Sequence, residues 1–298
     1  MNQNKTNINW YPGHMAKTKK QIQEDLKLVD VVVEILDARI PKSSQNPDMA
    51  KMIEGKKRIV VLNKSDLSEE NENKRWQEYF KNNNIPSVIV DSNSGSGVRE
   101  VISAVQRIMA DELEKQQQKG RVQKNIRIMI VGIPNVGKSS FINRISKRNA
   151  AIVGNKPGVT RQKQWVRIEN NIELLDTPGV LWPKFESEEV ALNLAFTGTI
   201  KSEIMDEYEI AFHLVQFLNK NYKKRLMERY SITNNEIENI FQDDEIQDTV
   251  NLIELIAKKR GAIMSGGRTD ETKVARLILD DFRTGKFGRI TLEKVGGK

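Results

Sequence analysis

The sequence predicts an α/β protein in two parts: a mainly parallel sheet with helices on both faces, followed by a smaller all-helical domain. Up to about residue 175, short apolar runs rich in β-branched residues recur between longer helix-like stretches. From about Met205 onward, apolar residues recur at helical spacing instead, as in Ile253, Ile256 and Ala257. We therefore expect a first domain over residues 1–204 and a helical domain over residues 205–298.

Six strands are expected in the first domain, near residues 30–36, 58–62, 87–90, 126–131, 165–168 and 172–175. The polar stretch 114–124 separates the first three strands from the rest. Its composition is typical of a helix end followed by a solvated connection, and we do not interpret it as a domain boundary.

Composition limits the class of protein. The chain has 298 residues, no cysteine and a formal net charge of +8, so disulfides and thiolate metal sites are excluded. The basic balance suggests a polyanionic partner, although ordinary soluble proteins also carry such an excess. The N-terminus lacks the apolar core of a signal peptide, and the longest apolar runs are too short to span a bilayer. We expect a cytoplasmic protein without a membrane partner.

A phosphate-binding loop is the strongest motif. Gly132 to Ser139 reads GIPNVGKS, follows an expected strand and precedes an expected helix, as the GxxxxGK[ST] loop requires. Its glycines let backbone N–H groups surround phosphates, Lys138 places positive charge on the β- and γ-phosphates, and the Ser139 hydroxyl can bind Mg²⁺. The nucleotide-binding candidates here are Asn135, Val136, Gly137, Lys138, Ser139 and Ser140.

A second motif identifies the base. Asn63-Lys64-Ser65-Asp66 follows the strand ending at Leu62 and has the N-K-x-D form. The Asp66 carboxylate can accept two hydrogen bonds from guanine, whereas adenine lacks both donors and would leave the acceptor unpaired. Lys64 can lay its aliphatic stem along the ring, and Asn63 can connect this loop to the phosphate loop. These residues predict a site for GTP and GDP.

Three further segments complete the expected site. Asp176-Thr177-Pro178-Gly179 has the D-x-x-G form, in which Asp176 holds a Mg²⁺-bound water and the Gly179 amide senses the γ-phosphate. Thr160 is the candidate for a switch hydroxyl on Mg²⁺. Ser92 and Asn93 lie where a further loop would support the base, although the same composition suits a plain turn.

The order of these motifs is unusual. The base loop and supporting loop precede the phosphate loop, the switch threonine and the D-x-x-G segment, whereas a conventional GTPase places them last. Moving two terminal strands to the front preserves sheet and pocket when the old termini lie close together. The sequence therefore predicts a circularly permuted Ras-like P-loop GTPase domain followed by a small all-α domain.

With these motifs in place, the chain resembles the bacterial ribosome biogenesis GTPase A family of circularly permuted GTPases. The resemblance includes Trp10 to Lys17 (WYPGHMAK), Asp37 to Pro41 (DARIP), and the closing region from Gly266 to Gly288. It implies GTP hydrolysis stimulated by the large ribosomal subunit and coupled to binding and release of its precursor during late 50S assembly. It also implies contact between the helical domain and ribosomal RNA.

The resemblance suggests how the chemistry is completed. Val180 stands where a Ras-like enzyme has the glutamine that orients the attacking water, and valine cannot do this. The resemblance implies His14 in that role, and neutral imidazole can accept a proton near pH 7. The catalytic candidates are thus His14, Lys138 and Gly179. It also implies that Asn135 binds K⁺. A histidine without a role and an ordinary loop asparagine are the alternatives.

Basic residues are concentrated near the C-terminus. From Lys258 onward, eleven basic residues stand against five acidic ones. This favours a phosphate-backbone footprint, with a solvated helical surface as the alternative. The RNA-binding candidates are Lys258, Lys259, Arg260, Lys273, Arg276, Arg283 and Lys286. A nucleotide-gated RNA-binding scaffold is the alternative function, a trafficking or signalling GTPase is disfavoured because no lipidation signal is present, and we expect a monomer when free.

Overall fold

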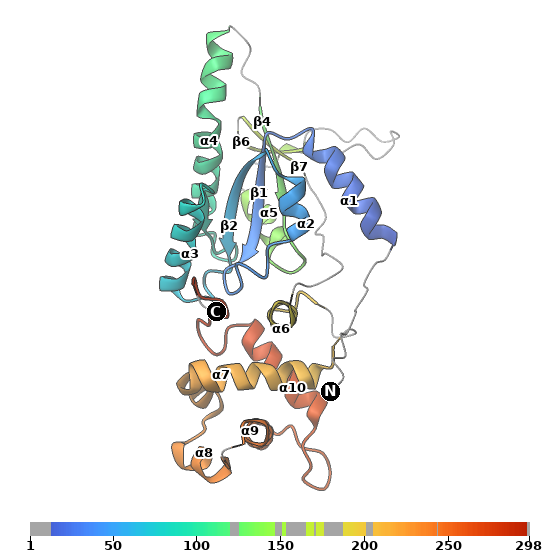
Figure 1. The fold of residues 1–298 in the computed structure, drawn as a ribbon, viewed down its shortest axis with the longest axis vertical. Coiled ribbons are helices and arrows are strands. Elements are labelled where there is room, and N and C mark those ends of the chain that lie inside the picture. Colours follow the sequence, from blue (N-terminus) through green and yellow to red (C-terminus); the bar gives the residue numbers. More distant parts are fainter. Residues whose placement is uncertain are drawn as a thin grey trace. The chain divides into compact units, whose positions relative to one another are not determined.

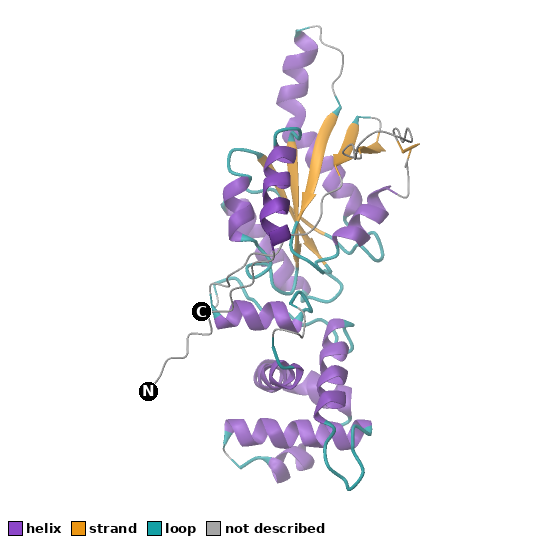
Figure 2. Cartoon of the chain, turned by 90° about the vertical axis from the view of Figure 1, so that its right-hand side faces the viewer, coloured by secondary structure: helices purple, strands orange, loops and turns teal. Residues whose placement is uncertain are grey.

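The computed structural model describes residues 13–119, 125–146, 151–152, 165–169, 171–175, 187–200, 205–242 and 244–296. The chain forms two compact units: residues 187–292 make one, and residues 1–186 together with 293–298 make the other. Figure 2 shows strands in the first unit and helices in the second. We expected the division after residue 204; it lies before α6 (Glu188–Phe196), because α6 packs on α7 (Glu207–Tyr230) and α10 (Glu271–Arg283).

The first unit is built on one mixed sheet, and the predicted mainly parallel sheet with helices on both faces is confirmed (Figure 1). Its described strands are β1 (Val31–Asp37), β2 (Lys57–Asn63), β3 (Ser87–Ile89), β4 (Ile126–Val131), β5 (Ala151–Ile152), β6 (Trp165–Glu169) and β7 (Ile172–Leu175). Their order is β3-β2-β1-β4-β7-β6-β5. The first five in this order pair parallel, and β6 pairs antiparallel with both β7 and β5.

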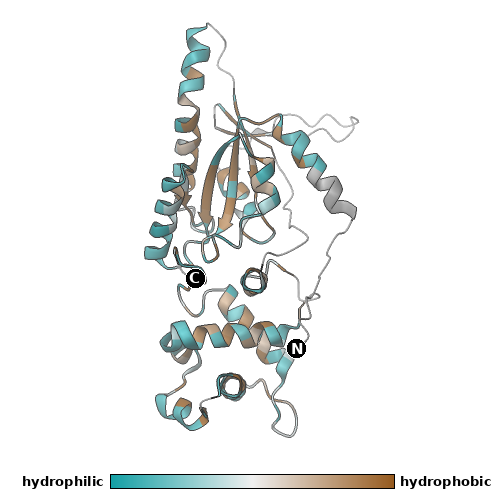
Figure 3. Ribbon diagram, viewed as in Figure 1, coloured by the Kyte–Doolittle hydropathy of each residue, from teal (hydrophilic) through white to brown (hydrophobic). Residues whose placement is uncertain are grey.

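One face of the sheet is covered by α1 (Gly13–Leu26), α2 (Pro47–Met52) and α3 (Glu70–Asn82). Val32 and Leu36, four residues apart on β1, point to this face because side chains alternate along a strand. Val32 packs with α1 and α2, and Leu36 packs with Trp76 and Phe80 of α3. In Figure 3 the strands are mostly brown, the colour of hydrophobic residues, whereas the helices carry both brown and teal residues. Burial of this apolar surface is the main driving force for the layer.

The remaining helices of the first unit are α4 (Val98–Gln118) and α5 (Lys138–Ser146). They pack on each other, and α4 also packs on β2. Both present a stripe of fully or nearly fully buried residues, Val101 and Val105 on α4 and Phe141 and Ile145 on α5. Helix α5 begins directly after the glycine-rich loop, so the core contacts of Phe141 fix the direction in which its N-terminus points.

Residues 293–296 belong to the first unit, contrary to the expected all-helical end. Glu293 accepts hydrogen bonds at its carboxylate from the backbone N–H of Lys42 (2.6 Å) and Ser43 (3.0 Å). Its backbone N–H donates to Arg39 O (3.3 Å), and Trp76 Nε1 donates to Glu293 O (2.9 Å). Sequence periodicity could not show this, because the contacts join residues from opposite ends of the chain.

The second unit is a bundle of α6, α7, α10, α8 (Asn234–Ile240) and α9 (Glu245–Arg260). The N-termini of α7, α8, α9 and α10 are capped by the side chains of Asp206, Thr233, Asp244 and Asp270, respectively. Helix α9 ends at Gly261 in the left-handed conformation (φ 66°). The core contains fully buried Leu214, Leu252 and Ile278, one from each long helix. Among the described residues of either unit, no helix is both long and apolar enough to cross a membrane.

Candidate nucleotide-binding site

The base loop, the supporting loop and the phosphate loop meet at the carboxyl ends of the parallel strands of the first unit. Strand β2 ends at Asn63, β4 ends at Val131 just before the glycine-rich loop, and β1 lies between them. Asp37 at the end of β1 is in register with Asn63. The chain turns outward from β1 to β2 and β3 and later places β4 on the other side of β1, so the strand order reverses there. Ligands of open α/β sheets bind at such a switch point.

Two glycines of the phosphate loop are required by close packing. A Cβ at Gly132 would lie 2.5 Å from Ile35 O, and a Cβ at Gly137 would lie 2.3 Å from Asn63 Nδ2. Both have positive φ values, 153° and 94°, which L side chains rarely adopt. The glycines therefore bring the phosphate loop directly against the neighbouring strands, as well as opening its backbone toward a ligand.

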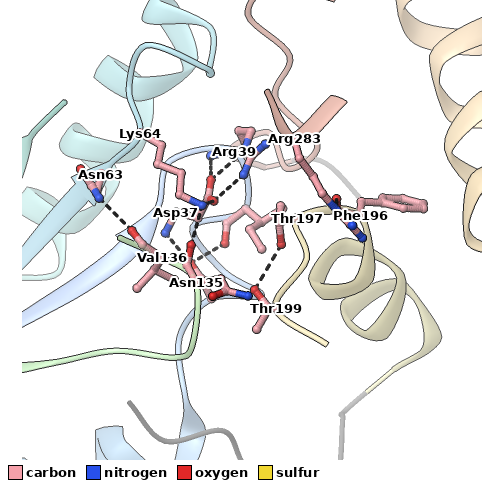
Figure 4. A network of polar contacts seen from close by, with 12 residues as sticks. Asp37, Arg39, Asn63, Lys64, Asn135, Val136, Phe196, Thr197, Thr199 and Arg283 are labelled. Atoms are coloured by element: carbon pink, nitrogen blue, oxygen red, sulfur yellow. Dashed lines mark hydrogen bonds and ion pairs between the residues drawn. The ribbon is translucent and has the colours of Figure 1, made fainter. Parts of the chain in front are cut away.

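Asn63 connects three loops. Its Nδ2 donates to Val136 O in the phosphate loop (2.8 Å), and its Oδ1 accepts from the Ser92 backbone N–H (3.2 Å) and hydroxyl (2.7 Å). Asn63 and Ser92 are both buried. The structure thus brings the base loop, the supporting loop and the phosphate loop together through one amide, and Figure 4 shows its bond to Val136.

Lys64 makes a second connection between the base loop and the phosphate loop. Its Nζ donates to Asn135 O (2.6 Å) and lies 3.0 Å from Asp37 Oδ2 (Figure 4). Lys64 and Asn135 both have left-handed backbones, with φ values of 60° and 62°. Such values are uncommon outside glycine, and here the two strained residues face each other across the loops.

Asp37 and Arg39 form a buried ion pair beside Lys64. Arg39 donates to Asp37 from its backbone N–H (3.0 Å), from Nε (3.0 Å) and from Nη2 (2.7 Å). Burial by itself would raise the pKa of Asp37, but the charges of Arg39 and Lys64 outweigh it and hold the pKa well below its usual value. In the sequence, the DARIP segment indicated only the family resemblance, and no role was predicted for Asp37 or Arg39.

Asp66, the predicted acceptor for guanine, carries a buried carboxylate oxygen. Its Oδ1 is buried and accepts no hydrogen bond from the part of the chain that the structure describes. Burial and the neighbouring charge of Asp91 raise its pKa. A buried acceptor without a partner costs free energy, which a bound donor would recover. This is the property expected of the residue that reads guanine.

The supporting loop is contacted by a side chain of α5, the helix that follows the phosphate loop. Arg144 of α5 donates through Nη2 to Asn93 O (2.8 Å) and to Ser94 O. The Asn93 backbone N–H donates to Asp91 Oδ1 (2.8 Å), which closes the turn. Ser92 is buried against Asn63, and Asn93 is exposed. Arg144 was not predicted, since an arginine on a helix carries no sign in the sequence of the loop that it will contact.

Lys138 and its neighbours begin α5. Lys138 Nζ donates to Ile133 O (2.5 Å), and burial lowers the pKa of Lys138 to about 8. Ser139 and Ser140 are exposed in the first helical turn. Phosphate oxygens favour this position because the first-turn N–H groups and the helix dipole are both directed at it. No three His, Asp or Glu side chains within the described residues converge on a metal site.

Several predicted site residues cannot be placed. Thr160, Asp176, Gly179 and Val180 lie outside the described residues. His14 lies in the first turn of α1, and its side chain is outside the described part of that helix. The switch, the D-x-x-G segment and the catalytic histidine therefore remain predictions.

The predicted basic residues of the helical unit are mostly engaged within that unit. Arg276 pairs with Glu207 (2.7 Å), Lys259 with Glu236 (2.7 Å) and Lys286 with Asp281 (2.9 Å). Lys273 Nζ donates to Gly261 O (2.8 Å), and the Arg260 guanidinium lies over the Tyr230 ring at 5.3 Å. Lys258 is exposed near the end of α9. Much of this charge is therefore paired within the unit.

Arg283 has a local structural contact. It is half-buried, and its guanidinium donates to Phe196 O (3.1 Å) and Ala195 O (2.9 Å) at the end of α6 (Figure 4). These carbonyls belong to the last turn of α6, and Ala195 O also accepts from the Gly198 backbone N–H (3.0 Å). The RNA-binding candidates did not include Lys220, Lys223 and Lys224 on α7, although residues 219–225 read NKNYKKR.

Comparison with known proteins agrees with this arrangement. Residues 127–260 match the model of a family described as 50S ribosome-binding GTPase. Ribosome biogenesis GTPase A of Bacillus pumilus is 42% identical over 96% of this chain and 98% of its own length, and that of Thermotoga maritima is 32% identical over 96% and 94%. The crystal structure of GNP-bound YlqF from T. maritima has a TM-score of 0.62 at 26% identity, covering 95% of this chain and all of that one. The chain therefore belongs to the ribosome biogenesis GTPase A family of circularly permuted GTPases, which bind guanine nucleotides and hydrolyse GTP.

Proposed function

We propose that this GTPase acts in the cytoplasm during late assembly of the large ribosomal subunit, binds the precursor particle as a monomer, and is released when GTP is hydrolysed. The observation that carries the proposal is the base loop at residues 63–66 joined to the phosphate loop at residues 132–139 in a chain that matches ribosome biogenesis GTPase A over nearly its full length. The description of the matching family supports the large subunit as the partner.

The proposed site divides the nucleotide among the three loops. Asp66 accepts from guanine, Lys64 covers the ring, and Ser92 and Asn93 support the base. Asn135, Val136, Gly137, Ser139 and Ser140 surround the phosphates with Lys138, whose ammonium exchanges Ile133 O for phosphate oxygens. A buried lysine with lowered pKa is stabilised in its charged form by such an anion.

Mg²⁺ fits the residues at the start of α5. The exposed Ser139 hydroxyl can bind it together with phosphate oxygens, and Thr160 and Asp176, the latter through water, are the other proposed ligands. The ion neutralises charge that develops on the phosphates. Asn135 is exposed on the phosphate loop, as a K⁺ ligand must be, and K⁺ remains part of the proposal.

Hydrolysis also needs a group that orients the attacking water. Neither Val180 nor Leu181 can donate or accept a hydrogen bond through its side chain. The family resemblance implies His14 in this role, and its imidazole can accept a proton from water. The Gly179 amide senses the γ-phosphate. The large subunit is expected to stimulate turnover by ordering His14 and the switch residues around bound GTP.

The proposed RNA contacts are the exposed cations of the helical unit. Lys258 and Lys273 lie on α9 and α10, and surface ion pairs such as Arg276 with Glu207 are weak enough to exchange a carboxylate for a phosphate. Lys259, Arg260 and Lys286 complete the set. Arg283 is its weakest member, because its donors already satisfy two carbonyls.

The decisive experiment measures GTP turnover with and without purified large subunits, in K⁺ and in Na⁺. We expect stimulation by the subunit and a higher rate in K⁺. An unchanged rate at every subunit and K⁺ concentration would contradict the proposal. Subunit binding in GDP, GTP and a non-hydrolysable analogue, measured beside single-turnover hydrolysis, distinguishes it from a scaffold in which hydrolysis is incidental.

The variant His14→Ala tests the catalytic assignment. It should abolish stimulated turnover and leave GDP affinity near that of the unsubstituted protein, since the histidine acts on water and not on the nucleotide. His213, on α7 of the helical unit, supplies the matched control, because His213→Ala removes an imidazole from another unit. Normal hydrolysis by the His14 variant would refute the assignment.

A further inference from the structure

The guanine loop depends on a side chain outside the loop itself. Within the described residues, Lys64 Nζ contacts the neutral carbonyl of Asn135 and the carboxylate of Asp37. The Asp37 side chain is 2% exposed and that of Lys64 is 21% exposed, so water screens their attraction poorly. The carboxylate is therefore the stronger of the two partners that determine where the ammonium lies.

The Asp37 carboxylate is held rigidly on its other side. Arg39 donates to both of its oxygens from Nε and Nη2, and adds its backbone N–H to Oδ1. Asp37 also ends a fully buried strand and is in register with Asn63, the residue before Lys64. Both the backbone position and the side-chain orientation of Asp37 are thus fixed before any ligand arrives.

This arrangement constrains a strained residue. Lys64 has a φ of 60°, a backbone conformation that costs free energy for any residue with a Cβ. The backbone position of Lys64 and the fixed position of its ammonium together determine where the aliphatic stem between them can lie. The stem is the part of Lys64 proposed to cover the base, so the orientation of Asp37 is transmitted to the base surface.

We propose that Asp37 is a positioning residue for guanine-nucleotide binding, acting through Lys64, and that Arg39 holds Asp37 in place. The inference rests on the proposed role of Lys64 against the base. In this proposal Asp37 acts only through Lys64. Because a lysine stem covers any purine ring alike, Asp37 sets the strength of base binding and leaves the choice of base to Asp66.

The test is a double-mutant cycle on GDP affinity, measured by titration calorimetry with Asp37→Asn, Lys64→Ala and the double variant. Asp37→Asn should weaken GDP binding about tenfold, as expected for loss of one charge-assisted contact. The same substitution should have almost no further effect in the Lys64→Ala background. An equal loss in both backgrounds would overturn the proposal, because Asp37 would then act without Lys64.

A matched control is available on the same strand. Glu34 is also about 1% exposed and pairs with Arg58, away from the guanine loop. Glu34→Gln removes a buried carboxyl group from the same strand and should leave GDP affinity unchanged. If Asp37→Asn does not fold because the buried Arg39 loses the Asp37 carboxylate, Asp37→Asn with Arg39→Gln removes both charges and tests the same prediction.

Inosine diphosphate, which lacks the 2-amino group, separates position from base choice. Asp37→Asn should weaken GDP and inosine diphosphate by the same factor, and a changed ratio would contradict the proposal. If Lys64→Ala leaves GDP affinity unchanged, the base-site assignment fails. If Lys64→Ala weakens GDP and Asp37→Asn does not, only the role of Asp37 fails.

Discussion

The charged residues of the two units serve different kinds of contact. In the first unit, Asp37 and Lys64 are 2% and 21% exposed and are joined to each other and to the phosphate loop. In the helical unit, the Arg276 side chain is 65% exposed and pairs with one surface glutamate. A small rigid ligand is bound best by side chains whose positions are fixed before it arrives, because a misplaced side chain reduces the binding free energy.

A phosphate backbone makes less stringent demands. Exposed ion pairs contribute at most about 1 kcal/mol, so a cation can leave its glutamate for a phosphate at small cost. Pairing within the helical unit is therefore compatible with RNA binding for Arg276 and Lys259. It is much less compatible for Arg283, whose donors satisfy helix-end carbonyls. The following predictions test this contrast, from the largest effect to the smallest.

Substitution of Asp66 should have the largest effect. Asp66→Ala removes the acceptor for two guanine donors, and GDP affinity should fall by about 100-fold or more, since hydrogen bonds to charged groups contribute about 1.5–3 kcal/mol each. Calorimetric titration measures the loss. As a control, Asp66→Asn should gain affinity for xanthosine diphosphate, whose 2-oxo group accepts from the amide. Unchanged GDP binding by the alanine variant would show that the base is recognised elsewhere.

Asn63 should be essential for stability as well as binding. Asn63→Ala leaves Val136 O and the Ser92 donors without partners in a buried position, which we expect to cost about 2–3 kcal/mol of unfolding free energy. Urea denaturation followed by circular dichroism gives the value. The exposed Asn93 provides the control, and Asn93→Ala should change stability by less than about 0.5 kcal/mol. Equal effects would mean that Asn63 does not join the loops.

The pH dependence of GDP affinity should report Lys138. Burial lowers the pKa of Lys138 to about 8, and the phosphates bind its charged form. Affinity should be independent of this group below pH 8 and fall as pH rises above it, by up to about tenfold per pH unit for one linked proton. Titrations from pH 7 to 9 measure the slope. Lys138→Met, which cannot titrate, should remove it, and an unchanged slope in that variant would exclude Lys138 as its source.

The basic surface of the helical unit should give the smallest individual effects. Lys258→Gln should weaken binding to large-subunit RNA a few-fold and reduce the salt slope by about 1, with no change in stability. Arg283→Gln should instead lower stability by about 1–2 kcal/mol, because the hydrogen bonds from the guanidinium to Phe196 O and Ala195 O are lost, and leave the salt slope unchanged. The opposite pattern would assign the RNA contact to Arg283.

Features that depend only on neighbouring residues could be predicted from the sequence alone. The phosphate loop and the guanine loop are each contiguous, and each follows a strand whose β-branched run identifies it. Strand periodicity and the order of the motifs therefore predicted the α/β class, the permuted arrangement and the roles proposed for Lys138 and Asp66. The change to helical spacing likewise predicted a helical second unit.

Contacts between residues far apart in the chain could be identified only from the tertiary structure. Asp37 contacts Lys64 because β1 pairs with β2 in a register that aligns Asp37 with Asn63, and strand register cannot be obtained from either strand alone. Glu293 returns to Ser43 across the whole chain, and Arg283 satisfies the end of α6 instead of remaining on the surface. Local pattern specifies elements and motif chemistry, whereas the partners of buried charges depend on packing between elements far apart in the chain.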